Sequence, residues 1–248
     1  MKRFLSFIIC LLFPVRYTYW FLNLLGHKVN SKANIGFSII WVTKLQMNQN
    51  SRIGHFNLIF VNKIEMDFGS YIGRLNFLKG SFSVLFKNDS AIGNNCIISR
   101  APLGISYGNS QLSLGVLSKL TSGHKLDMMR SISIGDYSTI AGIRSQFWTH
   151  GYLHAPTGSD RIRIDGEINI GNNVYIGSSC VINAGIFVAD SITIGSNSCV
   201  SKNLIKPGMY VAQPLRHIEK DFDETKNKLK RIDWDGLVEE AYEKPSSG

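Results

Sequence analysis

The chain has 248 residues, enough for one large domain or two small ones with a sizeable hydrophobic core. It carries 27 Lys and Arg against 18 Asp and Glu, a formal charge of +9, yet only 18% of its residues are charged and 44% are hydrophobic. This composition excludes a disordered chain and a highly charged nucleic-acid-binding tail, so no nucleic acid partner is expected. The four cysteines form no CxxC pair, which argues against a disulfide scaffold or a structural zinc site and fits a reducing compartment.

Residues 1–30 are basic and strongly apolar. The run from Phe4 to Leu25 is rich in aliphatic and aromatic side chains, and no acidic residue precedes Glu65. A signal peptide is disfavoured because large aromatics stand where a cleavage site needs small residues. A membrane-spanning helix is disfavoured because Pro14 and Arg16 would lie near its middle.

Two interpretations of residues 1–30 remain. The segment either lies in the membrane interface, with its basic side chains on anionic lipid, or forms a capping helix that buries its apolar face on the main domain. We favour the first interpretation, which predicts a cytoplasmic protein that is peripherally associated with the inner face of the cytoplasmic membrane.

A six-residue repeat dominates residues 31–215. The dipeptide Ile-Gly occurs eight times, first at Ile35 and last at Ile194, and the gaps between its copies include 18 (twice), 36 and 42 residues. From residue 164 the repeats run without a break: IDGEIN, IGNNVY, IGSSCV, INAGIF, VADSIT, IGSNSC, VSKNLI, KPGMYV. An aliphatic residue opens most repeats, and small residues favour the second and fifth positions.

Each repeat is expected to form one short strand and one corner, so that three repeats make a triangular coil. The aliphatic residue would point inward, and Gly, Ala or Asn would take the tight corner. Coils would stack about 4.8 Å apart through parallel strand pairing. Cys96 and Cys180 occupy fifth positions, so we expect small core fillers rather than reactive thiols. The sequence therefore predicts an all-β parallel β-helix.

This repeat resembles that of the hexapeptide-repeat acyltransferases, which fold as left-handed parallel β-helices. The resemblance is strong over residues 164–216, fair over 132–150 and weaker over 31–103. The ending KPGMYVAQPLRHI resembles the family's last coil, with Gln213 where Gly is usual. The family is normally trimeric, with active sites between neighbouring subunits, so the resemblance implies a homotrimer. Beyond the β-helix, residues 216–248 are expected to form a partly helical tail.

Two excursion loops are expected, near residues 104–131 and 146–163. The second contains FWTHGYLHAPTGSDRIR and precedes the run IGNNVYIGS. In the maltose and galactoside acetyltransferase branch, a Thr-His element precedes a similar run, and its histidine is the catalytic base. The resemblance thus implies that His150 is the base. His154, in the same excursion, is the alternative base or a group that holds the acceptor. Trp148 and Tyr152 flank the base and are expected either to stack on a sugar or to line a subunit interface.

The reaction implied by this resemblance is acetyl transfer from acetyl-CoA, the acyl donor, to a sugar hydroxyl. A neutral imidazole takes the hydroxyl proton as the oxygen attacks the thioester, and no metal is expected. By the same resemblance, the coenzyme A contacts fall on Ser178, Ser196, Ser201, Lys202 and Arg216. Small residues would let the pantetheine approach the backbone, and the basic residues would pair with phosphates.

The expected role is O-acetylation in surface polysaccharide (O-antigen or capsule) biosynthesis, on a sugar or lipid-linked oligosaccharide acceptor. Three alternatives stay open: an amino-sugar N-acyltransferase, a hexapeptide-repeat carbonic anhydrase, and a non-catalytic β-helix that serves as an assembly module. The carbonic anhydrase would need His150, His154 and a third metal ligand from His124 or a neighbouring subunit. Outside that alternative, the expected structural or surface histidines are His27, His55, His124 and His217.

Overall fold

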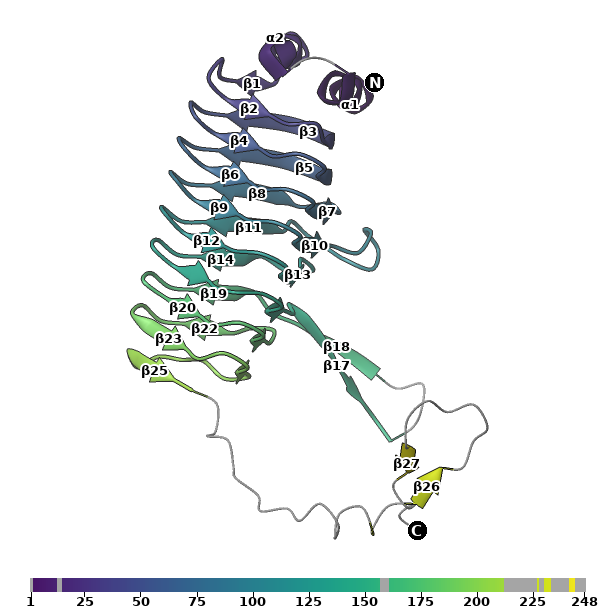
Figure 1. The fold of residues 1–248 in the computed structure, drawn as a ribbon, viewed down its shortest axis with the longest axis vertical. Coiled ribbons are helices and arrows are strands. Elements are labelled where there is room, and N and C mark those ends of the chain that lie inside the picture. The colour runs from purple at the N-terminus through teal and green to yellow at the C-terminus, as the bar shows by residue number, and fades with distance from the viewer. Residues whose placement is uncertain are drawn as a thin grey trace. The chain divides into compact units, whose positions relative to one another are not determined.

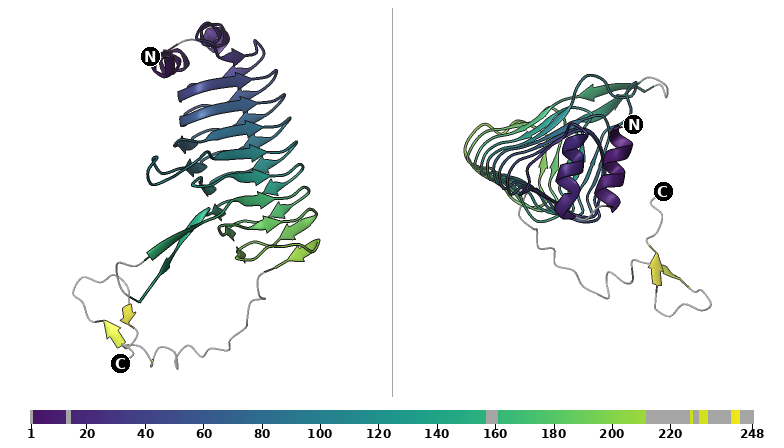
Figure 2. Two further views of the ribbon diagram at one scale, coloured as in Figure 1. Left: turned by 180° about the vertical axis from the view of Figure 1, so that it is seen from behind. Right: turned by 90° about the horizontal axis from the view of Figure 1, so that it is seen from above.

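A computed structural model of the chain describes residues 2–12, 15–156, 161–211, 227, 230–232 and 241–243. The chain divides into two units, residues 1–212 and 213–248, which we describe separately. In the first unit, short strands stack coil upon coil, and the view along the stack shows a triangular outline (Figures 1 and 2). The expected left-handed parallel β-helix is confirmed.

One face of the prism is a parallel sheet built from one short strand of each coil. Its strands are β2 (Asn34–Ile35), β4 (Arg52–Ile53), β6 (Tyr71–Ile72), β9 (Ala91–Ile92), β12 (Lys119–Leu120), β15 (Thr139–Ile140), β20 (Tyr175–Ile176), β23 (Ile192–Ile194) and β25 (Gly208–Tyr210).

The other two faces form a second, larger parallel sheet. They are joined because the long strand β5 pairs with β7 through residues 58–60 and with β8 through residues 63–66. The strands of this sheet are β1 (Lys28–Val29), β3 (Ile39–Met47), β5 (Leu58–Met66), β7 (Phe77–Lys79), β8 (Ser83–Phe86), β10 (Ile97–Ser99), β11 (Gln111–Leu114), β13 (Lys125–Asp127), β14 (Ile132–Ile134), β16 (Gln146–Phe147), β19 (Ile168–Ile170), β21 (Val181–Ile182), β22 (Phe187–Val188) and β24 (Cys199–Val200).

The core is a column of inward-pointing aliphatic side chains. All eight isoleucines of the Ile-Gly dipeptides are buried, none more than 4% exposed. Burying one such side chain stabilises a fold by about 1.5–3 kcal/mol, so this column is a major source of stability. Cys96 and Cys180 are buried as expected, and burial raises the pKa of the Cys96 thiol to about 11.

The glycines of the dipeptides are needed for close stacking. A Cβ on Gly54 would lie 2.3 Å from the carbonyl oxygen of Gly73, and one on Gly93 would lie 1.9 Å from that of Thr121. The left-handed turn falls later in the corner, for example at Asn95 with φ of 56°. The expectation that these glycines take the tight turn is therefore corrected: they let successive coils approach each other.

A polar ladder runs inside one corner. Asn76 accepts a hydrogen bond from the backbone N–H of Cys96 at 2.8 Å, and His124 Nδ1 accepts one from the N–H of Ser145 at 3.2 Å. His124 is 1% exposed, and burial lowers its pKa to about 4. It is a structural residue, as expected.

Helices α1 (Lys2–Leu12) and α2 (Val15–Leu24) lie across the N-terminal end of the prism (Figure 2). Between them stands Pro14, which lacks the amide donor that one continuous helix would need. The helices bury Ile9, Cys10 and Leu22 in the core, and Ser6 Oγ lies 2.8 Å from Nε2 of the buried His27. The helices thus cover the end of the core, the packing that the second of the two interpretations expects.

The cap also keeps apolar side chains at its surface. Phe4, Tyr17, Trp20 and Leu24 are each at least 50% exposed, and the last three lie on one stripe of α2. Among the described residues, no helix is long and apolar enough to cross a membrane.

The first excursion is shorter than the expected 104–131. Residues 111–127 form a regular coil, β11 to β13, in which Leu112, Leu114, Leu120 and Leu126 fill the core. Leucine in place of isoleucine hides this coil from the repeat pattern, and only residues 101–110 leave the ladder as one long loop. The second excursion is an antiparallel hairpin of β17 (His150–His154) and β18 (Arg161–Asp165), hereafter the arm, which projects from the stack (Figure 1).

In the second unit, the described residues include one antiparallel strand pair, β26 (Lys230–Ile232) with β27 (Ala241–Glu243). The partly helical tail expected over 216–248 otherwise falls on residues outside the described ranges.

Candidate active site

The candidate site lies at one corner of the prism, where both excursions leave the ladder. Strand β13 stacks on β16, with Leu126 opposite Phe147. Asp127 ends β13, and Thr149 and His150 follow β16 one coil further on. This register brings the carboxylate beside the start of the arm.

Asp127, Thr149 and His150 form a hydrogen-bonded group around one carboxylate oxygen. Oδ2 of Asp127 accepts from the Thr149 hydroxyl at 2.6 Å and from the Thr149 backbone N–H at 3.1 Å. The same oxygen lies 2.8 Å from Nδ1 of His150. Asp127 is 8% exposed and Thr149 is fully buried, so the two residues that hold His150 are shielded from solvent. The side chain of His150 itself is 25% exposed.

This geometry fixes the tautomer of His150. A carboxylate oxygen can only accept, so the proton of the neutral imidazole sits on Nδ1. Nε2 therefore keeps its lone pair and can take a proton from a bound hydroxyl. The carboxylate also stabilises the imidazolium that results, the arrangement that orients a general base.

The arm places the other excursion residues along one face of β17. The ring centroids of Trp148 and His150 are 6.5 Å apart, those of His150 and Tyr152 5.9 Å, and those of Tyr152 and His154 6.4 Å. His154 is exposed, and no carboxylate of the described residues lies within hydrogen-bond distance of it. The geometry therefore favours His150 over His154 as the base.

Arginine contacts hold the root of the arm. Arg163 pairs with Asp165 at 2.8 Å and donates to the carbonyl oxygen of Ile105 at 2.6 Å, which ties the arm to loop 101–110. Buried Arg100 binds the loop from below, donating to the carbonyl oxygens of Tyr107 and Gly108. The site thus stands on two excursions that brace each other.

The residues expected to contact coenzyme A fall on two different corners of one chain. Ser178 and Ser196 stack in one corner, where the Ser196 hydroxyl accepts from the Ser178 N–H at 3.2 Å. Ser201 and Lys202 are exposed and follow β24, on the corner of His150 but two coils further along. Arg216 lies outside the described residues.

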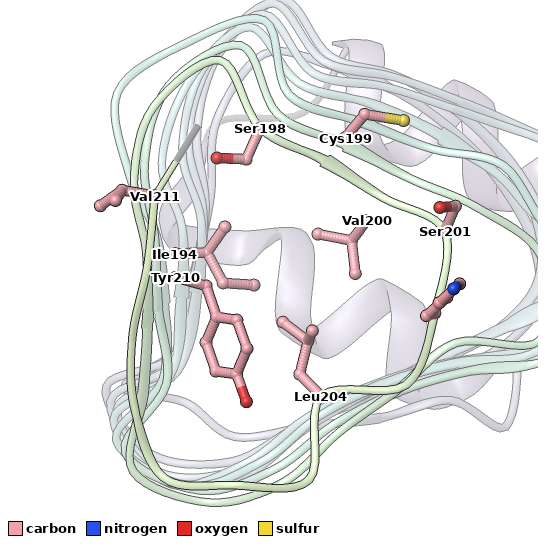
Figure 3. A pocket seen from close by; sticks show the side chains of 9 residues that line it. Ile194, Ser198, Cys199, Val200, Ser201, Leu204, Tyr210 and Val211 are labelled. Carbon is pink, nitrogen blue, oxygen red and sulfur yellow. The ribbon is translucent and has the colours of Figure 1, made fainter. Parts of the chain in front are cut away.

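Ser201 and Lys202 also line a pocket of about 270 Å³ at the last described coil. Ile194, Val200 and Leu204 point into it, as Figure 3 shows, so its floor is the final layer of the prism core. The volume is below the roughly 300–1,000 Å³ of typical small-molecule sites. The exposed Lys202 stands at its rim.

The described part of the chain offers no set of ligands for a metal ion. No group of three His, Cys, Asp or Glu side chains gathers there in a way that could hold a metal ion. His124 faces the interior ladder, and His27 holds the helical cap, so neither is directed toward His150. His55 accepts from the Phe37 N–H, and His217 is outside the described residues.

Sequence reasoning missed Asp127. The signal that could have found it is the stacking register: in a β-helix, residues one coil apart are neighbours, and Asp127 lies one coil before His150. That register was hidden because the expected excursion over 104–131 removed Asp127 from the ladder.

The chain matches no family model. It is 36% identical over 76 residues to a chloramphenicol acetyltransferase of Morganella morganii, covering 30% of this chain and 36% of that protein. It is 33% identical over 103 residues to the galactoside O-acetyltransferase of Escherichia coli (strain K12), covering 39% of this chain and 48% of that protein. The matches thus span less than half the length of these relatives.

Among solved structures, the polysialic acid O-acetyltransferase OatWY aligns with a TM-score of 0.53 at 13% identity, covering 81% of this chain and 92% of that one. At this identity the similarity to that structure concerns the fold alone. In sequence, the chain is thus similar over less than half of its length to acetyltransferases, and its fold is that of the left-handed β-helix acetyltransferases. His150 belongs to the Thr149-His150 element, and Asp127 gives it a carboxylate partner from the coil before.

Proposed function

We propose that this protein is an O-acetyltransferase that moves an acetyl group from acetyl-CoA to a sugar hydroxyl during surface polysaccharide biosynthesis. The observation that carries the proposal is the Asp127–His150 pair at 2.8 Å, at the root of an arm that bears aromatic side chains. The relatives in this family that carry out acetyl transfer support the donor class.

Acetyl-CoA would supply an activated thioester carbonyl. His150 Nε2 removes the proton of the acceptor hydroxyl as that oxygen bonds to the carbonyl carbon. The C–S bond breaks, and the same nitrogen returns the proton to the departing sulfur, so the base is regenerated. Asp127 stabilises the protonated ring meanwhile, and Thr149 fixes the carboxylate with two hydrogen bonds. Ser178, Ser196, Ser201 and Lys202 are the residues of this chain proposed to hold the donor.

The assay is acetyl transfer from radiolabelled acetyl-CoA to a panel of sugars. We expect His150→Ala to lower kcat/KM by at least ~10²-fold and His154→Ala by much less, with both variants folded by circular dichroism. Product linkage is then tested with mild alkali, which cleaves an ester and spares an amide. An alkali-stable product would instead establish N-acylation. Loss of activity in His154→Ala alone would move the base to His154.

A homotrimer is part of this proposal. The outer face of the arm carries Leu153, Ile162 and Ile164, exposed by 57%, 61% and 53%. Packing against a second copy would bury them and bring together the two corners that carry the donor residues. Light scattering of the purified protein tests the assembly: an active monomer would rule out sites shared between subunits.

Peripheral membrane contact, at the cytoplasmic face, is proposed for the outer side of the helical cap. Its exposed Phe4, Tyr17 and Trp20 suit the headgroup region, and the first 64 residues carry no acid to oppose anionic lipid. Co-sedimentation with phosphatidylglycerol vesicles should fall in the triple Ala variant. Equal binding of the variant and the parent protein would exclude this surface.

A further inference from the structure

Two pairs of side chains, each a cation next to an aromatic ring, lie on either side of His150 and have no part in the proposed proton transfer. Lys125 Nζ lies 4.9 Å from the centroid of Trp148, and the Arg161 guanidinium carbon lies 5.2 Å from that of Tyr152. His150 stands between the two rings, 6.5 Å and 5.9 Å away. The candidate base is therefore flanked on both sides by a cation–aromatic pair.

Both cations are available for an anionic ligand. Lys125 and Arg161 are exposed, and neither forms a salt bridge with a carboxylate within the described residues. The neighbouring arginines differ: Arg163 is paired with Asp165, and Arg130 with Glu167 at 3.4 Å. Two cations without a carboxylate partner among the described residues thus lie next to the two rings.

The pairs come from different parts of the fold. Lys125 begins β13 on the prism, Trp148 follows β16, and Tyr152 and Arg161 face the same side of the arm on opposite strands. Each ring holds its cation in place through a cation–π contact, which lowers the entropy lost when the cation binds an anion. Each pair offers an apolar ring face and a fixed positive charge.

Such a surface suits an acidic sugar chain. A sugar presents C–H faces that pack on aromatic rings, and its carboxylate or phosphate pairs with Lys or Arg. Because the base is between the pairs, the reacting hydroxyl would belong to a residue with neighbours on both sides.

We propose that the acceptor is an anionic oligosaccharide acetylated at an internal residue, with Lys125–Trp148 and Arg161–Tyr152 binding the acidic residues that flank the reacting one. This inference rests on the proposed acetyltransferase function and names its acceptor class.

The experiment measures acetyl transfer to oligomers of one to six residues. The probes are oligogalacturonate, α2,8-linked oligosialate and hyaluronan fragments, each beside its methyl ester, in which the charge is removed and the sugar kept. We expect at least one acidic series to exceed its ester by about tenfold or more in kcat/KM, with oligomers of three or more residues better than monomers. The preference should shrink as salt rises from 50 to 500 mM, about a tenfold range of ionic strength that screens partly exposed charges.

Substitutions of the two cations test whether they cause the preference for acidic acceptors. We expect Lys125→Gln and Arg161→Gln each to reduce the acid-to-ester ratio by about threefold to tenfold, and the double variant to abolish the preference. The matched control is Arg52→Gln, which removes an exposed cation 4.6 Å above the Tyr71 ring in another part of the prism and should keep the ratio of the parent protein.

Three results would overturn the inference. They are ester and acid used equally in every series, monomers as good as longer chains, or a raised KM for acetyl-CoA in Lys125→Gln with an unchanged acid-to-ester ratio. The last result would assign Lys125 to the donor phosphates. Failure of the proposed function is distinct, because the protein would then transfer acetyl to neither acids nor esters.

Discussion

Asp127→Asn is the sharpest test of how His150 is activated. One oxygen, Oδ2, takes part in all the contacts with Thr149 and His150 described above, and an amide oxygen can occupy its place. The substitution therefore keeps the acceptor geometry and removes the negative charge. Asp127→Ala is less informative, because it leaves a buried N–H donor unpaired and costs about 1–3 kcal/mol in stability.

The expected magnitude follows from Coulomb's law. An imidazolium and a carboxylate with charge centres about 4 Å apart attract by about 4 kcal/mol at an effective dielectric constant of 20. The His150 side chain is 25% exposed and that of Asp127 11%, so solvent screens part of this attraction. We expect about 1.4–2.7 kcal/mol to be lost in the transition state, which is about a 10- to 100-fold decrease in kcat.

The measurement is steady-state acetyl transfer at saturating acetyl-CoA. Because Asp127 acts through His150, kcat should fall while KM for both substrates stays within about twofold. Asp67→Asn is the matched control, since that carboxylate accepts a hydrogen bond from Asn48 on the surface of an earlier coil. An unchanged kcat in Asp127→Asn, or a loss explained entirely by unfolding in thermal melts, would refute the positioning role.

Two further predictions concern the prism. The pKa of His124 is about 4 in the fold and 6.5 when unperturbed, so its stabilising contribution is present above pH 6.5 and lost as pH falls toward 4. His124→Asn, which copies Asn76 in the same ladder, should flatten the dependence of Tm on pH over this window; an equal slope in both proteins would contradict it. Gly93→Ala should destabilise the fold by about 2 kcal/mol or more in urea titrations, whereas Gly151→Ala, with open space around the new methyl, should change stability by less than about 0.5 kcal/mol.

The repeat is visible in the sequence because each inward position faces the same environment. A position such as Ile176 can only be aliphatic, since its side chain lies between the equivalent residues of two neighbouring coils. The coil over residues 111–127 obeys the same rule with leucine, which the Ile-Gly pattern does not detect. The helical cap was ambiguous for a related reason: an apolar run describes equally well a helix that lies on lipid and one that covers the end of a core.

The candidate base was predictable, but its partner was not. The Thr149-His150 pair is contiguous, so a local motif reveals it. Asp127 meets His150 only through the stacking of one coil on another, and that stacking depends on how many residues each excursion inserts. The Lys125–Trp148 pair depends on the same register. Side chains that meet across coils become predictable once each excursion has been assigned its correct length.

The corner at which the two excursions leave the β-helix is also the part of this fold that is best suited to hold a catalytic group. Inside the prism a polar group must be fully hydrogen-bonded, as His124 is, and has no access to a ligand. On a regular face a side chain is exposed but poorly supported. At the corner of Asp127, the carboxylate belongs to a rigid strand, and the histidine begins an arm that leads into solvent. The candidate base is thus held by the core and reached from outside, and under the proposed acceptor class the charges that flank it would select the acceptor.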